Sequence, residues 1–437
     1  MKRFFLAALA AVSLTLPAAA EIDIRQVTSP GGIDAWLVEE HSIPFVALEL
    51  RFDGGASLDA PGRRGETSLM THLLEEGAGE MDAQAFTAAT EALAADFSFD
   101  PGADSVAVSA RVLTENRDEA MGLLRKALME PRFDADAIDR VRRQMISSIE
   151  SDARDPQIIA NRTFARLAYG DHPYGSATDG TVESLSGLTR DDLLAARSGV
   201  LARDRLVVAA VGDIDAEELG RLLDDLLGDL PETGAPMPED VAFGADGGVT
   251  VVDFDTPQSV AVFGQRGLKR HDPDFYAAFV MTHILGGHGF SSRLMEEVRE
   301  KRGLTYGIGA FLLPRDHSEE LFGMVSTANE RMAETIDLVR QEWRRMADEG
   351  VTQEELDRAR TYLTGAYPLR FDGNRKIANI LVGMQQEGLT PEYVTNRNAL
   401  IEAVTVEDIR RVAADLIDPD ALRFVVVGKP EGLEATN

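Results

Sequence analysis

The residues best suited to chemistry stand at 68–77, a stretch that reads SLMTHLLEEG. Its leucines and methionine recur at helical spacing, so we expect His72, Glu75 and Glu76 to share the opposite, polar side of a helix. Residues four apart lie one turn above each other on a helix. In zinc-dependent hydrolases two histidines at this spacing hold the metal beside a glutamate base, and the inverted order is H-x-x-E-H. Here Glu76 takes the place of the last histidine, so the stretch has the form of a zinc site that lacks one ligand.

Zinc chemistry at this stretch depends on where further ligands would come from. A catalytic zinc ion normally has three protein ligands and an open position for water. His72 and Glu76 supply two of them at most. A site with altered ligands would use the Glu76 carboxylate and take Glu80 or Glu150 as a displaced third ligand. The other interpretation is a polar helix face that holds no metal.

The remaining histidines form weaker patterns. His283 and His288 are five apart around two glycines, a spacing that does not stack them on one helix face. His172 precedes Pro173 and is expected to fix a turn. The other histidines have no companion residues at ligand spacing: His41, His271 and His317. The histidines therefore predict no second metal site.

Residues 1–20 have the pattern of a secretory signal. Lys2 and Arg3 form a basic start, 4–16 an apolar core, and 18–20 a run of small residues suited to cleavage. The apolar core is too short to span a bilayer, and no comparable run follows, although an uncleaved membrane anchor is the alternative interpretation. The chain has no cysteine, which excludes a lipid-anchored cysteine and a disulfide. Together these features predict a protein exported to a bacterial periplasm.

Length and charge limit the fold and the partners. The 417 residues that follow the signal suggest two or more domains. Removal of Lys2 and Arg3 takes the formal net charge from −30 to −32. A surface this acidic is unfavourable for binding nucleic acid or anionic membranes, and it serves solubility or favours basic partners.

The elements that position the candidate residues form a mixed pattern. Strands are expected at 22–38, 44–52, 106–112 and 206–211, with turn signals at the glycine pairs 31–32 and 54–55. Helices are expected at 65–77, 82–95, 115–129, 134–151, 156–169 and 189–200. Segment 230–238, with three prolines in nine residues, is the clearest linker.

After the linker the pattern begins again. Four segments recur in the same order: 70–74 at 281–285, 138–142 at 356–360, 188–193 at 404–409, and 206–212 at 422–428. Their offsets are nearly constant, which predicts a tandem duplication of a unit of roughly 200 residues. We therefore expect domains at 21–229 and 241–437, joined by a linker at 230–240. The fold class expected is α+β, two α/β-sandwich domains with helices packed on a mostly antiparallel sheet.

Several motifs make the chain resemble the insulinase-like (pitrilysin) zinc metallopeptidases, in the branch with two such domains per chain and paired chains. They are the degenerate motif at 72–76, DHPYG at 171–175, the strand ending VGD at 211–213, and the segment 292–306, which is the most distinctive. The resemblance covers nearly the whole mature chain. It implies a clam-shell of two chains that encloses a cavity, with the proline-rich linker as a flexible joint.

The resemblance also implies which positions correspond to the metal site. The two histidine ligands of the family fall on His72 and Glu76, and its general base falls on Glu75. The third ligand, a glutamate eight residues before a proline, falls on Ser148. A neutral hydroxyl is a poor zinc ligand, so no metal is expected in this chain. Glu75 then has no metal-activated water to deprotonate.

Two supporting positions depart from the family in the same way. The glutamate that lies seven residues before the third ligand becomes Val141, and the asparagine that helps to hold substrate becomes Ser98. The departures thus gather around the metal site.

Arg299 and Tyr306 keep the family spacing of seven residues. The resemblance implies that such a pair binds the substrate backbone and steadies the oxyanion, a task for which a guanidinium and a phenol are suitable donors. The alternative is that Arg299 is a solvated helix charge and Tyr306 an edge-strand aromatic.

The resemblance therefore implies a non-catalytic subunit of a periplasmic heterodimeric zinc metallopeptidase. The chain would carry no cofactor, and zinc would sit in a homologous partner subunit with an intact H-x-x-E-H. Arg299 and Tyr306 would act on peptides at the partner's site. Two alternatives stay open. One is a metalloendopeptidase that is active alone or as a homodimer with altered ligands, and the other is a non-enzymatic binding or assembly protein on the same fold.

Overall fold

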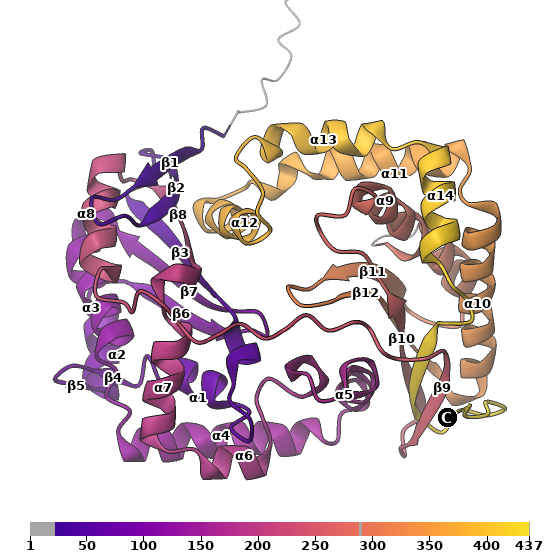
Figure 1. The fold of residues 1–437 in the computed structure, drawn as a ribbon, viewed down its shortest axis with the longest axis horizontal. Coiled ribbons are helices and arrows are strands. Elements are labelled where there is room, and N and C mark those ends of the chain that lie inside the picture. The colour runs from indigo at the N-terminus through magenta and orange to yellow at the C-terminus, as the bar shows by residue number, and fades with distance from the viewer. Residues whose placement is uncertain (1–21, 288–290, 437) are drawn as a thin grey trace, which may run out of the picture.

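Two α/β units lie side by side in the computed structural model, which describes residues 22–287 and 291–436 (Figure 1). The predicted secretory signal at 1–20 lies outside these residues. In the described part of the chain, we find no helix whose length and apolar character would let it cross a bilayer.

The first unit is built on a six-stranded sheet in the order β1-β2-β8-β3-β7-β6. Neighbouring strands are antiparallel except β2 and β8. The central strand buries Leu48, Leu50 and Phe52 on one face, as its alternating sequence requires. The strands are β1 (Arg25–Thr28), β2 (Asp34–Glu39), β3 (Phe45–Asp53), β6 (Asp96–Pro101), β7 (Ser105–Leu113) and β8 (Leu206–Gly212), beside a short hairpin of β4 (Gly77–Ala78) and β5 (Met81–Asp82).

Helices of the first half cover one face of this sheet and enclose a continuous apolar core with it. They are α1 (Glu66–His72), α2 (Ala83–Ala92), α3 (Arg117–Met129), α4 (Ala135–Asp152), α6 (Val182–Gly187), α7 (Arg190–Val200) and α8 (Ala216–Leu227). The long apolar stripe of α8 begins at a capping box between Asp215 and Glu218. Most predicted helices of this half are confirmed to within a few residues, whereas α6, α8 and β6 were missed.

The second unit repeats this plan. Its sheet has the order β11-β12-β10-β13-β9, with only the β13–β9 pair parallel. The strands are β9 (Gly248–Asp253), β10 (Gln258–Arg266), β11 (Ile308–Pro314), β12 (Glu319–Ala328) and β13 (Arg423–Gly428). Its own core lies under α9 (Phe275–Gly286), α10 (Met332–Glu349), α11 (Gln353–Ala366), α13 (Tyr393–Ala403) and α14 (Val406–Leu416).

The internal repeat is confirmed, because each recurring segment falls in the equivalent element of the other unit. The four pairs are α1 with α9, α4 with α11, the start of α7 with that of α14, and β8 with β13. Both α7 and α14 begin at a Thr–Asp capping box, Thr189 with Asp192 and Thr405 with Asp408. The expected fold class, a duplicated unit of helices on a mostly antiparallel sheet, is therefore confirmed.

The two units exchange one helix each, which the sequence did not reveal. The helix α5 (Pro156–Tyr169) packs on β10 and β13 of the second sheet through Ala160, Phe164 and Ala168. In return, α12 (Asn374–Gln386) lies on β3 and β8 of the first sheet, with Leu381 and others against Trp36. Figure 1 shows both helices beside the sheet of the opposite unit. Each sheet is thus covered on its second face by the other half of the chain.

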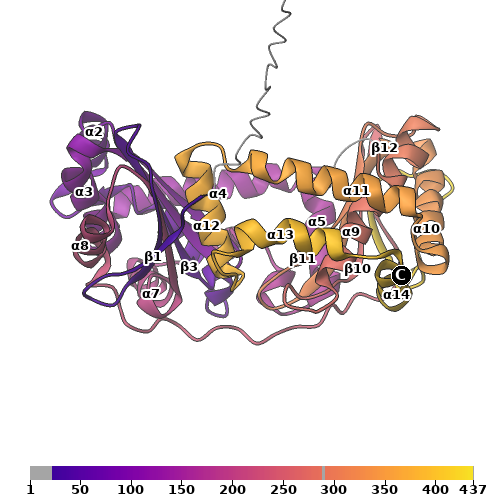
Figure 2. The ribbon, with the colours of Figure 1, turned by 90° about the horizontal axis from the view of Figure 1, so that it is seen from above.

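The segment between α8 and β9 contains no helix or strand and runs along one side of both units (Figure 2). It is bonded to each of them: Arg203 donates its backbone N–H to the carbonyl of Pro231, and Gly244 donates to Ala168. The linker predicted at 230–240 falls in this segment, and the domain boundaries drawn around it stay a prediction.

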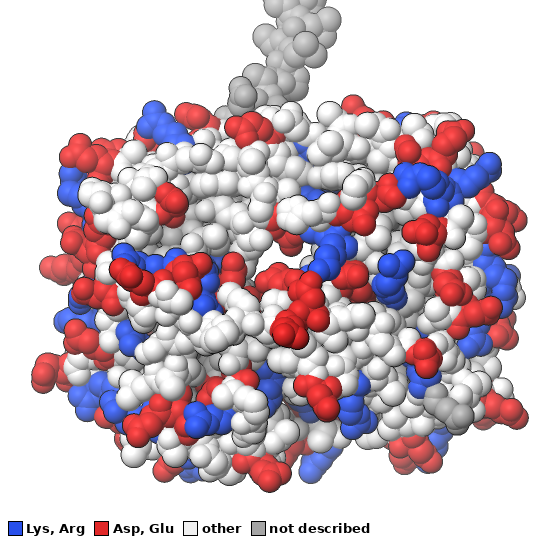
Figure 3. Space-filling view, in the orientation of Figure 1, with Lys and Arg blue, Asp and Glu red and all other residues white. Residues whose placement is uncertain are grey.

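Acidic and basic side chains are interspersed on the face drawn in Figure 3, with a hollow near its centre between the two units. Because each sign is interrupted by the other, this face offers no extended basic surface of the kind that nucleic acid needs.

Candidate functional site

A cavity of about 230 Å³ lies between the end of α1 and the middle of α4. It brings together positions that are far apart in the sequence. Its lining residues are His72, Glu75, Glu76, Val141, Gln144, Met145, Ser148 and Asp179. Five of the six positions that the resemblance assigned to the metal and its support are thus gathered around one space, and the sixth, Ser98, does not line it. Gln144 and Asp179 were not singled out from the sequence, and neither stands in a ligand-like pattern.

The backbone at His72 differs from the prediction. The helix α1 ends at His72, and the next residues form i→i+3 bonds in which Leu74 donates to Thr71 and Glu76 donates to Leu73. The expected helix at 65–77 is therefore too long, and His72 and Glu76 are not related by one α-helical turn. The cause lies just beyond, where Gly77 adopts a φ of +113° and the chain enters β4.

The predicted division of the stretch into two sides is confirmed. Leu69, Met70, Leu73 and Leu74 are fully buried in the first core, whereas the His72 and Glu75 side chains are exposed. The apolar residues fix the chain against the core and turn the acidic and imidazole groups toward the cavity.

Glu76 is paired with a cation. Its carboxylate accepts a hydrogen bond from the guanidinium of Arg140, which projects from α4. The pair is partly exposed, with 24% of the Glu76 side chain and 48% of the Arg140 side chain accessible. The guanidinium engages one oxygen of this carboxylate, Oε2, and competes with a metal for its negative charge.

Glu75, the position of the family base, keeps its proton more readily than an ordinary glutamate. Partial burial raises the pKa of the Glu75 carboxyl, and the nearby carboxylates of Glu76 and Asp100 raise it further. The Glu75 carboxyl therefore lies among negative charges.

The far wall of the cavity offers no ligand at the expected positions. Ser148 is exposed with a neutral hydroxyl, and Val141 is part of the apolar core. Glu80 and Glu150, the displaced ligands considered above, do not line the cavity. Among the residues that the structure describes, no three His, Cys, Asp or Glu side chains are arranged to hold a metal ion. The residues present do not fit a catalytic zinc ion.

Ser98 lies on β6, one of the two edge strands of the first sheet. Arg375 reaches it from the exchanged helix α12, donating to the Ser98 hydroxyl at 3.4 Å and lying 3.8 Å from the Asp96 carboxylate. The position that corresponds to the substrate-holding asparagine is therefore covered by a side chain of the second half.

Arg299 and Tyr306 lie in the second unit and do not line the cavity. Arg299 is in the π-helix η5 (Met295–Glu300), with its Nε 3.7 Å from the Glu300 carboxylate. Tyr306 stands in the loop before β11 and is 91% exposed, so it is not on an edge strand. The ring of Tyr306 is thus presented to the surroundings of this chain.

Two of the other histidines make structural contacts. The Nδ1 atom of His172 accepts a hydrogen bond from the backbone N–H of Tyr174 at 3.2 Å, which confirms its expected part in a turn. His283 stacks on Tyr362 with ring centroids 5.2 Å apart. His288 lies outside the described residues.

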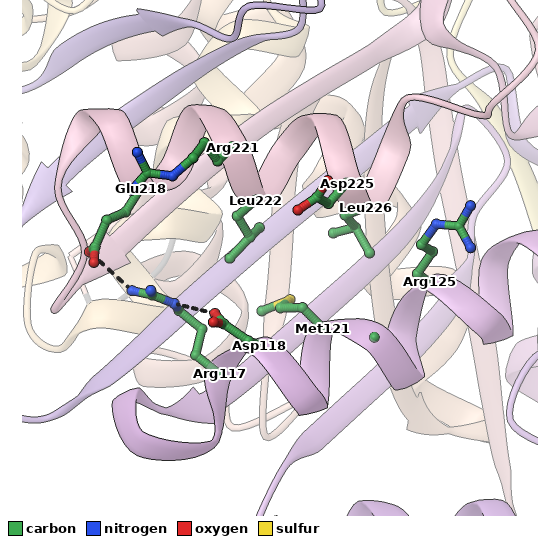
Figure 4. Close-up of a pocket in the computed structure, with 10 residues that line it drawn as sticks. Arg117, Asp118, Met121, Arg125, Glu218, Arg221, Leu222, Asp225 and Leu226 are labelled. Atoms are coloured by element: carbon green, nitrogen blue, oxygen red, sulfur yellow. Dashed lines mark hydrogen bonds and ion pairs between the residues drawn. The ribbon is translucent and has the colours of Figure 1, made fainter.

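A separate cavity of about 360 Å³ opens between α3 and α8 (Figure 4). Met121 and Leu222 project into the space between the two helices. At one end the guanidinium of Arg117 donates to the carboxylates of Glu218, at 3.2 Å, and Asp118, at 3.3 Å. This cavity is lined by charged residues of the outer helices and shares no residue with the cavity around His72.

Comparison with known proteins gives a consistent result over both halves. The family model "Insulinase (Peptidase family M16)" matches residues 35–182, and the model "Peptidase M16 inactive domain" matches residues 187–363. The chain is 28% identical over 371 residues to the "non-peptidase homolog YmxG" of Helicobacter pylori, which covers 85% of each protein. It is 26% identical over 402 residues to the "uncharacterized zinc protease SCO5738" of Streptomyces coelicolor, over 90% of this chain and 87% of that protein.

The fold also matches solved structures. A "peptidase M16 inactive domain" from Pseudomonas fluorescens superposes with a TM-score of 0.88 and 28% identity, over 95% of this chain and 100% of that one. Family models on both halves and a shared two-unit architecture lead to one conclusion: this chain belongs to the insulinase family, peptidase family M16.

Proposed function

We propose that this chain is the non-catalytic subunit of a periplasmic heterodimeric zinc metallopeptidase. A homologous partner with an intact H-x-x-E-H supplies zinc and the base, and this chain supplies one half of the chamber together with Arg299 and Tyr306. The observation that carries the proposal is the pairing of Glu76 with Arg140 opposite a serine at the third ligand position.

The Glu76–Arg140 pair acts against metal binding in two ways. The guanidinium engages one oxygen of the carboxylate that would have to ligate zinc. It also places a positive charge next to the site, where it would repel a divalent cation. With Ser148 neutral, the cavity then lacks both the ligands and the charge balance of a zinc site.

Tyr306 supports a role toward a second chain. A tyrosine normally buries much of its ring, and one with 91% of its surface exposed has that surface available for another molecule. Arg299 and Tyr306 would donate hydrogen bonds to the carbonyl oxygen of the scissile peptide as negative charge develops on it. The names of the H. pylori and P. fluorescens relatives, non-peptidase homolog and inactive domain, are in keeping with this division of labour.

The test is reconstitution. An exported relative with an intact H-x-x-E-H is produced with this chain and alone, and peptide cleavage and zinc content are measured for each chain and for the mixture. We expect activity only in the mixture, with zinc in the partner. Full activity of the partner alone, unchanged when this chain is added, would refute the proposal. Cleavage by this chain alone would establish the alternative, an active peptidase with altered ligands. The name of the S. coelicolor relative, a zinc protease, is in keeping with that alternative.

A further inference from the structure

The second unit contains a cavity of about 440 Å³ that is separate from the one around His72. It lies between α9, α12 and α13, close to where β11 ends at Pro314. Asn379, on its α12 wall, accepts a hydrogen bond from Arg51 of the first sheet, so the cavity adjoins the contact between the two units. Its volume is within the range of small-molecule binding sites.

Aromatic rings form most of the apolar wall. They are Phe275, Tyr276, Phe279, Tyr367 and Tyr393. Two arginines hold these rings in place: Arg270 lies 4.4 Å over the centre of the Phe275 ring, and Arg397 lies 4.4 Å over that of Tyr367. Rings fixed by cations on their faces give a preformed wall for a flat or branched apolar group.

The cavity is positively charged in a strongly acidic protein. Three arginines line it, Arg270, Arg370 and Arg397, and the only carboxylate among its lining residues is Glu387. That carboxylate lies 3.7 Å from the Nε atom of Arg270. Arg397 is bonded to the neutral carbonyl of Leu363 at 2.8 Å. An excess of positive charge in a chain of net charge −30 favours an anionic ligand.

A buried hydroxyl in the same wall lacks a partner. Tyr367 is 7% exposed, and its phenolic oxygen has no hydrogen-bond partner among the described residues. An unsatisfied buried hydroxyl is costly, so its retention is explained if a ligand provides the acceptor. Arg370 follows three residues later in the turn η7 (Pro368–Arg370), with its backbone N–H bonded to the Tyr367 carbonyl.

We propose that this cavity binds a ligand in which a large apolar group is joined to a carboxylate, as in the C-terminal residue of a peptide that ends in phenylalanine. The aromatic wall takes the side chain, the Tyr367 hydroxyl donates to the carboxylate, and Arg370 supplies the opposite charge at the mouth. That the carboxylate belongs to a peptide rests on the proposed function. That the cavity binds an apolar group joined to a carboxylate does not depend on it.

The test uses this chain alone, so that its outcome does not depend on a partner or on peptidase activity. Binding of N-acetylphenylalanine and of N-acetylphenylalaninamide, which lacks only the carboxylate, is measured by calorimetry. We expect the acid to bind at least about tenfold more tightly than the amide, since it gains charge-assisted hydrogen bonds. Equal affinities, or no binding of either compound, would overturn the proposal.

Two further probes distinguish a peptide ligand from a free aromatic acid. A pentapeptide that ends in phenylalanine is compared with 3-phenylpropionate, which has the same ring and carboxylate without a peptide chain. Tighter binding of the pentapeptide supports a peptide ligand. Tighter binding of 3-phenylpropionate overturns the peptide source and assigns the cavity to a free aromatic acid.

Variants then locate the contact. Tyr367→Phe removes an unpartnered hydroxyl and should leave thermal stability unchanged or raised, while weakening the acid about tenfold and the amide little. Arg370→Gln should do the same at an exposed position. Arg358→Gln, an exposed arginine on α11 outside the cavity, is the matched control and should leave the affinity unchanged. If Tyr367→Phe and Arg370→Gln bind the acid as the unaltered chain does, the assigned carboxylate contact is wrong.

Discussion

The carboxylate of Glu76, which lines the cavity between α1 and α4, is held by the guanidinium of Arg140. In a peptidase of this family the corresponding position is a histidine that must face a metal. Here the Glu76 carboxylate and the Arg140 guanidinium neutralise each other's charge. The position that lacks the histidine ligand thus carries a stable ion pair. The first two predictions follow from this pair.

The purified mature chain should contain no stoichiometric zinc. Glu76 is engaged by Arg140, and Ser148 offers only a neutral hydroxyl. Elemental analysis after purification without chelators measures the metal directly. About one zinc per chain that disappears in His72→Ala would contradict this expectation.

Repair of the ligands should depend on Arg140. The double variant Glu76→His with Ser148→Glu restores the family's ligand types but leaves the guanidinium of Arg140 beside the site. Adding Arg140→Gln should tighten zinc binding by about tenfold, which is roughly 1.4 kcal/mol. Turnover should remain low, because Val141 replaces a supporting glutamate.

The control for this series is Arg143→Gln in place of Arg140→Gln. Arg143 is an exposed arginine on the same helix whose guanidinium donates to the backbone carbonyl of Asp139 rather than to Glu76. It should change zinc affinity little. Equal effects of the two substitutions would show that general charge, rather than the Glu76 pairing, governs the site.

In the reconstituted complex, Tyr306→Phe should lower kcat by about 10²–10³, or about 3–4 kcal/mol, because one oxyanion donor is lost. Arg299→Ala should lower kcat and also raise KM if the guanidinium holds the bound peptide. Steady-state kinetics on a confirmed complex measures both.

Tyr362→Phe and Arg302→Ala are matched controls, since both residues are partly exposed in the second unit and lie outside the Arg299–Tyr306 pair. Neither should alter turnover, and no variant should change complex formation or the zinc content of the partner. Near-normal turnover in both Tyr306→Phe and Arg299→Ala would leave this chain as a wall of the chamber alone.

The exchanged helix α12 should contribute to the stability of the first sheet. Leu381→Ala removes a fully buried side chain from the cluster that contains Trp36. We expect a loss of about 2–5 kcal/mol in the free energy of unfolding. Denaturant unfolding followed by tryptophan fluorescence checks this, since Trp36 reports the first unit and Trp343 the second. Leu400→Ala, at a position 40% exposed, should cost less than about 0.5 kcal/mol.

The protein should lose stability through Asp316 as the pH rises. Burial, together with the nearby carboxylates of Asp104, Asp53 and Glu387, raises the pKa of the Asp316 carboxyl from its ordinary 3.8 to about 7. The folded state therefore holds this proton more tightly than the unfolded state, and its stability falls between pH 4 and 7. Above pH 7 the loss is complete.

Asp316→Asn should accordingly unfold at a higher temperature than the unaltered chain at pH 8, and this advantage should shrink as the pH falls from 7 to 4. Asp337→Asn, at an exposed position on α10, serves as the control and should show no such trend. A difference between Asp316→Asn and the unaltered chain that does not vary with pH would refute the assignment.

A helix or strand was predicted well from the sequence where residues typical of its two ends are present. The start of α5 is marked by Asp155, whose side chain accepts from two backbone N–H groups, followed by Pro156. Signals for missed elements were also present. In β6, Phe97 and Phe99 alternate with polar residues, and α8 follows a capping box at Asp215.

Contacts between segments far apart in the sequence could not be predicted from such local signals. The stripe of Phe164 and its neighbours shows that α5 buries one face, but an apolar stripe does not specify which sheet it meets. Likewise, Arg140 is one of several arginines on a polar helix face, and nothing local marks it as the partner of Glu76, 64 positions earlier. The positions around the cavity came from the family resemblance, whereas their electrostatic state came from the fold.

The exchange of α5 and α12 makes the two units depend on each other. A fragment that ends in the linker would carry α5 without the sheet it covers and would lack α12 over its own sheet. Each half would then expose an apolar sheet face, so neither is a self-sufficient module, although each contains a complete set of paired strands. Conversely, a chain cut only within 230–240 should stay assembled as two interlocked fragments, because the contacts that join them lie in the exchanged helices rather than in the severed backbone.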